Sequence, residues 1–543
     1  MRVLPLLLLA SCAASSAHHD HHHRHHAADH DTPEIPPAWI ESHVRFLADD
    51  LLEGRGVATR GDALARLYIR TQLEAAGLQP GGPEGSWEQP VPILGLTAEV
   101  TEPLRATNGT ETLAFEPVTD FTAVAARPAA ETSFDEAEVV FVGYGIDAPE
   151  QQWDDFKGMD LKGKVLLVMN SDPASDPNLF GGKARLYYGR WTYKYEEAAR
   201  RGAVGAIILH TNESAAYPWQ VVQSNHGREN FWLPFAPDAP TLAIRSWVTE
   251  EAGSRLCKLG GHDLAALRTS AESRDFKPVP LGVKVSLRTR NTVRELQSAN
   301  VLGMLPGSDP ALAKEVVVIT SHFDHLGIGT GRNGDRIHNG AVDNASGIAG
   351  MLAMARALKD MPRPRRSLLF AAVTAEESGL LGSSWYTRHP TVPQQQIVAN
   401  FNVDGLNVWG ATEDIEFVGH GKSDLTAVAE GVASDFGRRL TPDSSPDAGV
   451  FYRSDHFPFA RIGVPAAYFK AGSSFLDRPE DRKRMKASFT TIHYHQPSDE
   501  LAPWWNFASA AADTRLILAC LVATANRDQA PRWTPGDEFE KFR

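Results

Sequence analysis

The sequence predicts an α/β fold in which a mixed, mostly parallel sheet lies between two layers of helices. Three apolar segments typical of buried strands, 315–319, 367–373 and 398–403, alternate with two segments of helical periodicity, 344–358 and 380–388. Parallel strands that are buried on both faces have this almost wholly apolar composition, and the helices between them cover the sheet. Functional sites in such folds lie at the carboxyl ends of strands, so the residues just after each segment are candidates for function.

Two further regions precede this one in the chain. The first, from about residue 37, has helical patterns at 39–48 and 62–76, and the second combines short apolar strands with a helix at 193–201 and ends near residue 292. At 543 residues the chain is too long for one simple core, so two domains are expected. The net charge of −13, without a basic stripe, argues against nucleic acid as a partner.

The N-terminus has the features of an export signal. Met1-Arg2 is a short basic start, and residues 4–10 form an apolar run too short to span a bilayer. Leu9-Ala10-Ser11-Cys12 is similar to a bacterial lipobox, in which the cysteine is lipidated after cleavage. We therefore predict a signal peptide over residues 1–12 and an exported protein, in the periplasm or at the cell surface, that Cys12 anchors to a membrane through lipid. Ordinary signal cleavage near Ala17 is the alternative.

Residues 13–36 form a histidine-rich segment that offers no apolar core, so we predict a disordered linker. The tract at 18–30 is either a plain tether or a segment that gathers zinc or copper. No other run of the chain is long enough to predict a transmembrane helix. Cys257 and Cys520 fall in different predicted regions and are expected to be free and buried.

A set of histidines and acids at the predicted strand ends has the chemistry of a metal site. Asp343 has two carboxylate oxygens and can bridge two ions, so each ion would have three protein ligands and keep a position for water. An open position separates catalytic from structural zinc. A nitrogen and oxygen donor set without thiolate suits Zn²⁺ best and Mn²⁺ or Co²⁺ less well, so we predict two Zn²⁺ per chain. The predicted ligands are His322, Asp343, Glu377, Asp404 and His495.

Two further acids have predicted roles beside these ligands. Asp324 follows His322 by two residues in an extended segment, so it points to the same side and is expected to accept a hydrogen bond from the second imidazole nitrogen. Glu376, next to a ligand, can face the metal-activated water and take its proton as a general base, then return it as an acid.

Each of these residues also has an ordinary structural explanation when it is taken alone. The Glu376-Glu377 pair could be a solvated helix start, because acids favour helix N-termini. The complete set, in order and at strand ends, favours metal binding over these explanations. Two other histidines, His493 and His420, compete with His495 as the ligand. His325 and His338 are expected at the rim of the site.

Five motifs together resemble the M28 family of di-zinc aminopeptidases over about residues 295–530 and the N-terminal helices. The motifs are His322-Phe323-Asp324, Ala341-Val342-Asp343-Asn344-Ala345-Ser346-Gly347, Thr374-Ala375-Glu376-Glu377-Ser378-Gly379, Asn402-Val403-Asp404-Gly405 and Tyr494-His495-Gln496-Pro497-Ser498-Asp499.

The resemblance implies a role for each ligand. It places His322, Asp343 and Asp404 on one zinc ion, and Asp343, Glu377 and His495 on the other, with Glu376 as general base and acid. It also implies a cis peptide bond between Asp343 and Asn344.

The resemblance also implies a domain organisation. Residues 37–130 and 291–530 would form the peptidase domain, residues 531–543 a C-terminal tail, and residues 131–290 an inserted, β-rich α+β domain similar to the PA (protease-associated) domain. Arg453-Ser454-Asp455-His456 resembles a segment that lines the substrate cleft, so Asp455 is expected to hold the free amine of a substrate, and Tyr452, or Phe451 in another register, lies where some relatives polarise the carbonyl. A structural turn is the alternative for this segment.

The expected function is that of an exported aminopeptidase that hydrolyses peptides with a free N-terminus through a two-metal-activated water. A carboxypeptidase or glutaminyl cyclase activity on the same site is an alternative. A binding module that kept the fold is another, against which the complete ligand set argues.

Overall fold

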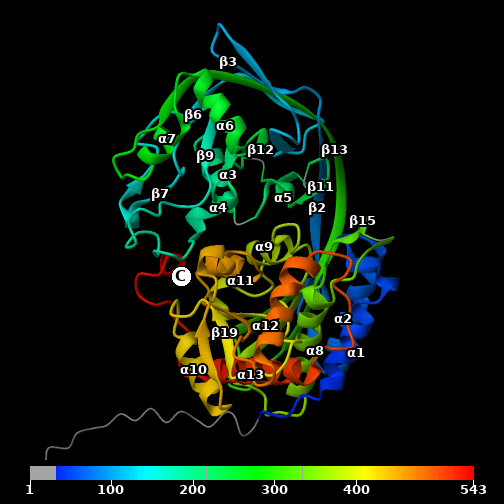
Figure 1. Cartoon of the computed structure of the whole chain (residues 1–543). Helices are drawn as coiled ribbons and strands as arrows, with labels where there is room; N and C mark the ends of the chain where they lie inside the picture. The colour runs from blue at the N-terminus through cyan, green and yellow to red at the C-terminus, as the bar shows by residue number, and fades with distance from the viewer. Residues whose placement is uncertain (1–31, 216, 224–225, 237, 333) are drawn as a thin grey trace, which may run out of the picture.

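A computed structural model of the chain describes residues 32–215, 217–223, 226–236, 238–332 and 334–543, which form two lobes joined by two long strands (Figure 1). The lower lobe in Figure 1 holds the N-terminal helices and the alternating strands and helices of the C-terminal half. The upper lobe holds most of the residues between them. The predicted signal peptide, Cys12 and the histidine-rich tract at 18–30 lie outside the described residues.

The lower lobe contains the predicted sheet. Four central strands run parallel to one another in the order β17–β14–β18–β21. Antiparallel strands flank them, with β13 beside β17 and β19 beside β21, while β20 is parallel to β19 and β1 pairs with β13. The predicted mixed, mostly parallel sheet is therefore confirmed. The strands are β1 (Gln79–Pro80), β13 (Val279–Leu305), β14 (Val316–His322), β17 (Ser367–Val373), β18 (Ile397–Asn402), β19 (Asp414–Val418), β20 (Arg439–Pro442) and β21 (Ala466–Ala471).

Helices cover both faces of this sheet, because successive residues of each strand point to opposite sides. In β17, Leu368 and Phe370 pack into the larger core with α1, α2, α8, α10 and α13, whereas Leu369 and Ala371 pack into a smaller core with α9 and α11. The helices of the lower lobe are α1 (Pro37–Leu47), α2 (Arg60–Ala75), α8 (Gly347–Leu358), α9 (Leu381–Arg388), α10 (Leu425–Asp435), α11 (His456–Arg461), α12 (Pro479–Ser488) and α13 (Phe507–Asn526).

The sequence predicted no further segment long and apolar enough to span a membrane, but one helix, α13, meets both criteria. By length and composition α13 is apolar enough to cross a bilayer, but 72% of its most apolar window is buried in the protein. Core helices of globular domains have this composition because they are apolar all round. The packing of α13 against α1, α8 and α10 assigns it to the core of the lower lobe.

The upper lobe has its own parallel strands and two apolar layers. β6, β9, β10 and β12 run parallel, and β5 pairs antiparallel with β12. One face of these strands packs with α6 and α7 and the other with α3. The main elements are β3 (Leu104–Thr107), β4 (Thr112–Phe115), β5 (Phe121–Ala125), β6 (Glu131–Phe141), β9 (Val165–Met169), α3 (Trp191–Arg200), β10 (Gly205–His210), α4 (Asn212–Ala215), α5 (Trp219–Gln223), β11 (Glu229–Trp232), β12 (Ile244–Thr249), α6 (Glu250–Leu259) and α7 (Leu264–Ser270).

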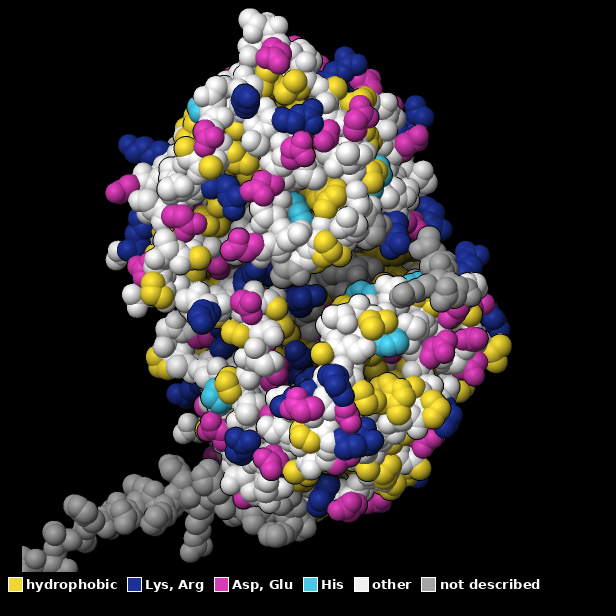
Figure 2. Space-filling model, in the orientation of Figure 1, with side chains coloured by type: hydrophobic (Ala, Val, Ile, Leu, Met, Phe, Trp, Pro, Cys, Tyr) yellow, Lys and Arg dark blue, Asp and Glu magenta, His cyan; other side chains and the backbone are white. Residues whose placement is uncertain are grey.

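A two-stranded ribbon connects the lobes. β13 has 27 residues and pairs antiparallel with β2 (Glu88–Val100) along the whole length of β2 (Figure 1). The opposite edges of the lobes also meet, since the rings of Tyr187 and Phe457 lie 4.9 Å apart and Arg461 Nη1 lies 3.3 Å from Glu196 Oε1. Between these two contacts Figure 2 shows a hollow, with histidine and basic side chains at its edges.

The cores place two predicted boundaries differently. Leu104, Phe115 and Phe121 belong to the core of the upper lobe, so the chain leaves the lower lobe near residue 100 rather than at residue 130. The C-terminal residues are not a free tail, since Trp533 and Phe539 are buried in an apolar cluster of the lower lobe. The physical reason is the same in both cases. These segments are too short and irregular for hydrophobic periodicity to predict their burial, yet their large apolar side chains pack into a core.

Candidate active site

The carboxyl ends of three adjacent parallel strands bring the predicted ligands together. His322 is the last residue of β14, Glu376 and Glu377 follow β17, and Asp404 follows β18. The strands β17, β14 and β18 are neighbours, so these side chains meet at one edge of the sheet, where α/β folds hold their sites.

Asp343 reaches the same place from the turn before α8. The two carboxylate oxygens of Asp499 accept hydrogen bonds from the main-chain nitrogens of Val342 (2.9 Å) and Asp343 (3.1 Å), which holds this turn in place. The Asp343–Asn344 peptide bond is cis, as expected from the family resemblance. Gly340, at a φ of 56°, leaves room for the turn, because a Cβ there would lie 2.2 Å from the carbonyl oxygen of Asp343.

A first group of side-chain atoms that could bind a metal ion, which we call the first donor group, surrounds the imidazole of His322. Its Nε2 lies 3.3 Å from Oδ1 of Asp343 and 3.4 Å from Oδ1 of Asp404. Burial lowers the pKa of His322, but the negative charges of Glu376, Asp343 and Asp404 outweigh burial and hold it well above its usual range. A positive charge is therefore strongly favoured at this position.

A second donor group shares Asp343 with the first. Nε2 of His495 lies 3.2 Å from Oδ2 of Asp343 and 3.0 Å from Oε2 of Glu377. This nitrogen is buried, and among the described atoms it has no partner with hydrogen-bond geometry. His493 instead contacts Ser498, and His420 contacts Glu430. His495 is thus the histidine of this segment that lies among the carboxylates.

His325 corrects the prediction of a rim residue. It is 1% exposed, and its Nδ1 lies 2.6 Å from Oε1 of Glu377. His325, Asp343 and Glu377 each offer one donor atom within 4.8 Å of the others, so His325 lies as close to this donor group as a ligand would. His338, also predicted at the rim, is 8% exposed and packs against His325. Both histidines are buried because Arg55 draws the loop that carries them onto the lower lobe, as described below.

Asp324 occupies a different position from the predicted one. The Nδ1 of His322 lies 3.2 Å from the main-chain oxygen of Asp324 but 3.8 Å from its carboxylate, so the expected partner of the imidazole is the backbone. The carboxylate instead accepts hydrogen bonds from the main-chain nitrogens of Glu376 (3.0 Å) and Glu377 (3.3 Å). It therefore positions the segment that carries both glutamates. Burial raises the pKa of Asp324 to about 7.

Glu376 faces the first donor group without being its closest member. Its Oε2 lies 4.0 Å from Nε2 of His322, farther than the nearest oxygens of Asp343 and Asp404. Burial raises the pKa of Glu376 well above its usual range; the positive charge of His322 opposes this shift and the charges of Glu377 and Asp404 add to it. A carboxyl group with a raised pKa accepts a proton more readily than an ordinary glutamate, as a general base must.

The two predicted substrate-binding residues differ in position: Asp455 is buried beside Ser383, whereas Tyr452 points away from the site. Asp455 is fully buried: its Oδ1 accepts a hydrogen bond from Ser383 Oγ (2.5 Å), and its Oδ2 has no partner among the described atoms. Tyr452 does not line the site, because its hydroxyl donates to Glu538 Oε1 (2.6 Å) and its ring packs in the cluster with Phe539. The C-terminal segment supplies both partners, which accounts for the difference.

Three residues that sequence reasoning missed support the site. Arg55 is buried, and its guanidinium donates to the main-chain oxygens of Phe323, Asn339, Gly340 and Leu47. These bonds attach the loop at 323–340, which carries His325 and His338, to the N-terminal helices. Ser454 Oγ donates to Oδ2 of Asp404 (2.6 Å), and Tyr468 donates to the main-chain oxygen of Asp404 (3.1 Å). Only the position of Ser454, next to a predicted substrate residue, was a signal in the sequence.

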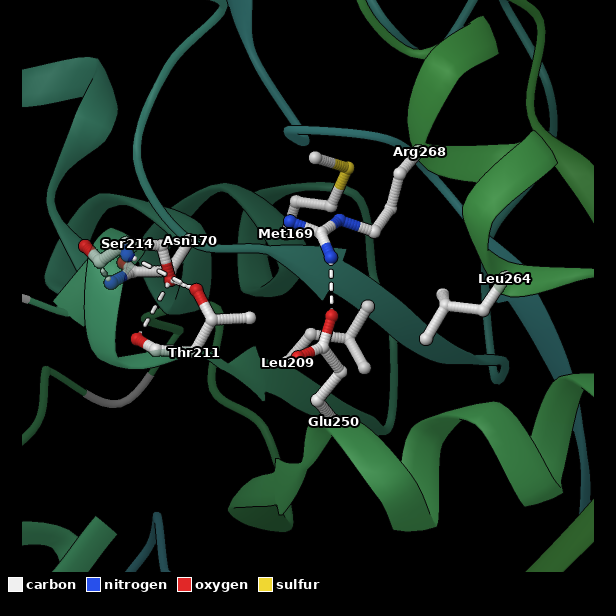
Figure 3. Close-up of a pocket in the computed structure, with 8 residues that line it drawn as sticks. All are labelled: Met169, Asn170, Leu209, Thr211, Ser214, Glu250, Leu264 and Arg268. Carbon is white, nitrogen blue, oxygen red and sulfur yellow. Dashed lines mark hydrogen bonds and ion pairs between the residues drawn. The ribbon is translucent and has the colours of Figure 1, made fainter. Parts of the chain in front are cut away.

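The donor groups are distinct from the small cavity of the upper lobe drawn in Figure 3. That cavity, of about 20 Å³, lies beside the ion pair of Arg268 and Glu250 and the hydrogen bond from Asn170 to Ser214. It has room for about one water molecule, and none of the predicted site residues lines it. A substrate would need a much larger space.

Parallel strands that carry histidine and carboxylate donors at their carboxyl ends define the class of α/β metallohydrolases. Residues 300–519 match the sequence description of peptidase family M28.

The individual relatives agree with this family. The chain is similar to an aminopeptidase NAALADL1 of Mus musculus, at 26% identity over 48% of this chain and 38% of that protein. It is also similar to aminopeptidase YwaD of Bacillus subtilis, at 31% identity over 34% of this chain and 36% of that protein. The matches thus span well under half of these curated relatives. The structure of an aminopeptidase from Aneurinibacillus sp. strain AM-1 shares the fold, with a TM-score of 0.51 at 19% identity over 93% of this chain and 97% of that one.

Proposed function

We propose that this protein is a zinc-dependent aminopeptidase that removes N-terminal residues from peptides, with two Zn²⁺ per chain. The observation that carries the proposal is the shared carboxylate: Asp343 lies between His322 and His495 with one oxygen toward each (3.3 and 3.2 Å). Two donor groups that share one carboxylate are the arrangement that two-metal hydrolases use.

The donor set supports zinc as the metal. It consists of imidazole nitrogens and carboxylate oxygens, with no thiolate, which suits Zn²⁺ and admits Mn²⁺ or Co²⁺. His322, Asp343 and Asp404 would hold one ion, and Asp343, Glu377 and His495 the other, with His325 beside Glu377. The buried Nε2 of His495 lies 3.0 Å from Oε2 of Glu377 and 3.2 Å from Oδ2 of Asp343 without hydrogen-bond geometry to either oxygen, and this placement among carboxylates supports a ligand role.

Several residues would have separate roles in hydrolysis of the scissile peptide bond. Bound zinc would lower the pKa of water and polarise the peptide carbonyl. Glu376 would accept the proton from the attacking water and deliver it to the leaving amine. Asp324 would keep Glu376 aimed at that water through the hydrogen bond to its main-chain nitrogen. The buried carboxylate of Asp455 would add to the negative charge that attracts the free amine of a substrate.

Export and membrane attachment belong to the same proposal. The N-terminal run and the Leu9-Ala10-Ser11-Cys12 sequence support export and lipid attachment at Cys12, with residues 13–31 as the tether. The predicted linker does not extend to residue 36, because Ile35 is buried in the core of the lower lobe. The upper lobe would act as the PA-like insertion and restrict access to the site, since it lies across a hollow from the lower lobe that carries the ligands (Figure 2).

The test measures metal content and turnover on the same samples. Full-length protein should bind two zinc ions by elemental analysis, hydrolyse aminoacyl-anilides, and lose that activity when a chelator removes the metal. Addition of zinc should restore it. N-acetylated substrates should not be cleaved, because the blocked amine carries no charge. Cleavage of blocked peptides at their C-terminus would instead favour a carboxypeptidase, and a protein with zinc but no turnover on either panel would contradict the proposal.

A further inference from the structure

Three arginines lie close together where the upper and lower lobes touch. Arg185 and Arg190 lie on either side of the short turn Tyr187–Gly189 of the upper lobe, and Arg453 follows the turn Val450–Tyr452 of the lower lobe. Gly449, at a φ of 62°, brings the lobes together there: a Cβ at this position would lie 3.5 Å from side-chain carbons of both Arg185 and Arg190. The main-chain nitrogen of Arg185 also donates to the carbonyl oxygen of Pro446 (3.0 Å).

Within the described part of the chain, no carboxylate forms a close ion pair with any of these three guanidinium groups. Among the ion pairs and hydrogen bonds of the described part of the chain, none involves the guanidinium of Arg185, Arg190 or Arg453. The Nε of Arg190 is buried and has no hydrogen-bond partner among the described atoms. The nearby carboxylate of Asp172 interacts with Arg185 but also with the buried Lys194, so it does not neutralise the three arginines.

The contrast with other arginines of this chain is clear. Arg66, Arg366 and Arg438, whose side chains are 18%, 1% and 12% exposed, each lie within 3.0 Å of a carboxylate oxygen. Arg185 and Arg190 are half-buried without such a partner among the described residues, and Arg453 is exposed beside them. Burial and the positive charges of Arg453 and Arg185 lower the pKa of Arg190 to about 10. Positive charges that are brought together, partly desolvated and left without a carboxylate cost free energy unless an anion joins them.

The arginines also adjoin the candidate active site. Arg453 precedes Ser454, whose hydroxyl donates to Asp404 Oδ2. Its charge acts on Tyr494, whose ring stacks on the ring of His495 with 3.8 Å between centroids. A single substrate molecule could therefore place an anionic group at the arginines and its scissile bond at the predicted metal ligands.

We propose that Arg185, Arg190 and Arg453 form a carboxylate-binding site for the part of the peptide substrate that lies beyond the scissile bond. This inference rests on the proposed peptidase function, because the anionic groups of a peptide are carboxylates. Guanidinium forks pair with carboxylates through two parallel hydrogen bonds, which gives both affinity and orientation. The carboxylate is either the C-terminus of a short peptide or an acidic side chain near its N-terminus, so the enzyme selects short or acidic peptides.

Two matched pairs of substrates separate these sources. Tri-alanine against its C-terminal amide tests the terminal carboxylate, and Ala-Glu-Ala-amide against Ala-Gln-Ala-amide tests the side chain. The full-length zinc enzyme should show a KM at least about tenfold lower for the carboxylate member of one pair, as expected for a charged hydrogen bond. A KM ratio of one in both pairs would overturn the proposal.

Substitutions then assign the preference to the arginines. Arg190→Gln and Arg453→Gln should each bring the KM ratio toward one, with a larger effect on KM than on kcat, and Arg190→Lys should retain part of the preference. Arg439→Gln, at a surface arginine with a 66% exposed side chain, is the matched control and should keep the full ratio. An unchanged ratio in both glutamine variants would contradict the assignment, and melting temperatures exclude misfolding.

A binding measurement distinguishes failure of this proposal from failure of the peptidase proposal. Calorimetry with the Glu376→Gln variant measures the affinity for tri-alanine and for its amide without turnover. Tighter binding of tri-alanine that Arg190→Gln abolishes would support a terminal-carboxylate site even if the wild type cleaves no peptide. Equal binding of the two ligands, together with equal binding of the glutamate and glutamine peptides, would overturn the site whatever the enzyme hydrolyses.

Discussion

The Nδ1 of His325 lies 2.6 Å from Oε1 of Glu377, in a pair that water barely reaches. The other oxygen of the same carboxylate lies 3.0 Å from Nε2 of His495. Glu377 therefore joins two imidazoles, one from the loop after β14 and one from the segment before α13. The positive charges of His495 and His325 hold the pKa of Glu377 at about 2, although burial and Asp343 act in the opposite direction.

Replacement of His325 should weaken the metal site. His325→Gln removes the imidazole that fixes Glu377, and the loss of such a supporting partner typically costs about 10- to 100-fold in metal affinity. Zinc affinity, measured by competition with a chromophoric chelator, checks this. His338→Gln, next to His325 but without a contact to Glu377 among the described residues, is the control; equal affinities for the two variants would refute the role of His325.

Glu376 should be needed for turnover and not for metal binding. Glu376→Gln keeps the shape of the side chain but cannot accept a proton, so kcat should fall by about 10²–10⁴-fold or more. Elemental analysis should find the same zinc content as in the wild type. Loss of one zinc ion would make Glu376 a ligand instead.

The shared position of Asp343 predicts different losses of metal for two aspartates. Asp343→Ala removes an oxygen from both donor groups and should abolish most zinc binding, whereas Asp404→Ala affects only the group around His322. Zinc per chain after dialysis should fall to nearly none in the first variant and to about one in the second. Equal stoichiometry in the two variants would argue against a bridging carboxylate.

Arg55 should contribute strongly to stability through its four main-chain acceptors. Arg55→Met leaves these buried carbonyl oxygens without donors, and each such loss costs about 1–3 kcal/mol, so the free energy of unfolding should fall by about 3 kcal/mol or more. Urea denaturation measures it. Arg45→Met, at a side chain that is 62% exposed and pairs with Glu41, should cost well under 1 kcal/mol.

His43 should make the lower lobe sensitive to mild acid. Burial, assisted by the charge of Arg356, lowers the pKa of His43 from 6.5 to about 4. Between these values the unfolded chain binds a proton that the folded chain does not, so stability falls as pH falls from about 6.5 to about 4. The loss from this residue at pH 5 is about 2 kcal/mol.

The pH dependence of unfolding checks this prediction. His43→Gln should flatten the dependence of the melting temperature on pH between about 4 and 6.5. It should not abolish that dependence, because burial also lowers the pKa of His456, to about 3. His262→Gln, at a half-exposed position after α6, is the control. A slope for His43→Gln equal to that of the wild type would contradict the assignment.

Sequence reasoning found the residues whose signal is local. His322, Glu376 and Asp404 follow apolar strands, and a parallel sheet necessarily gathers its carboxyl ends at one edge. The positions of Asp343 and His495 followed from motifs of the family, and the structure places both within 3.5 Å of their expected neighbours. His325 and Arg55 had no such signal, because their contacts join segments that lie far apart in the chain.

The sequence by itself determined the class of fold, the order of the elements and the donor set, because hydrophobic periodicity and strand-end chemistry are properties of short segments. Only the tertiary structure decided where the lobes divide, that Tyr452 turns toward the C-terminal segment, that Asp324 holds the glutamates instead of the imidazole, and that arginines of two lobes meet. These features depend on which distant side chain occupies each space, and packing between segments is not encoded in the periodicity of either one.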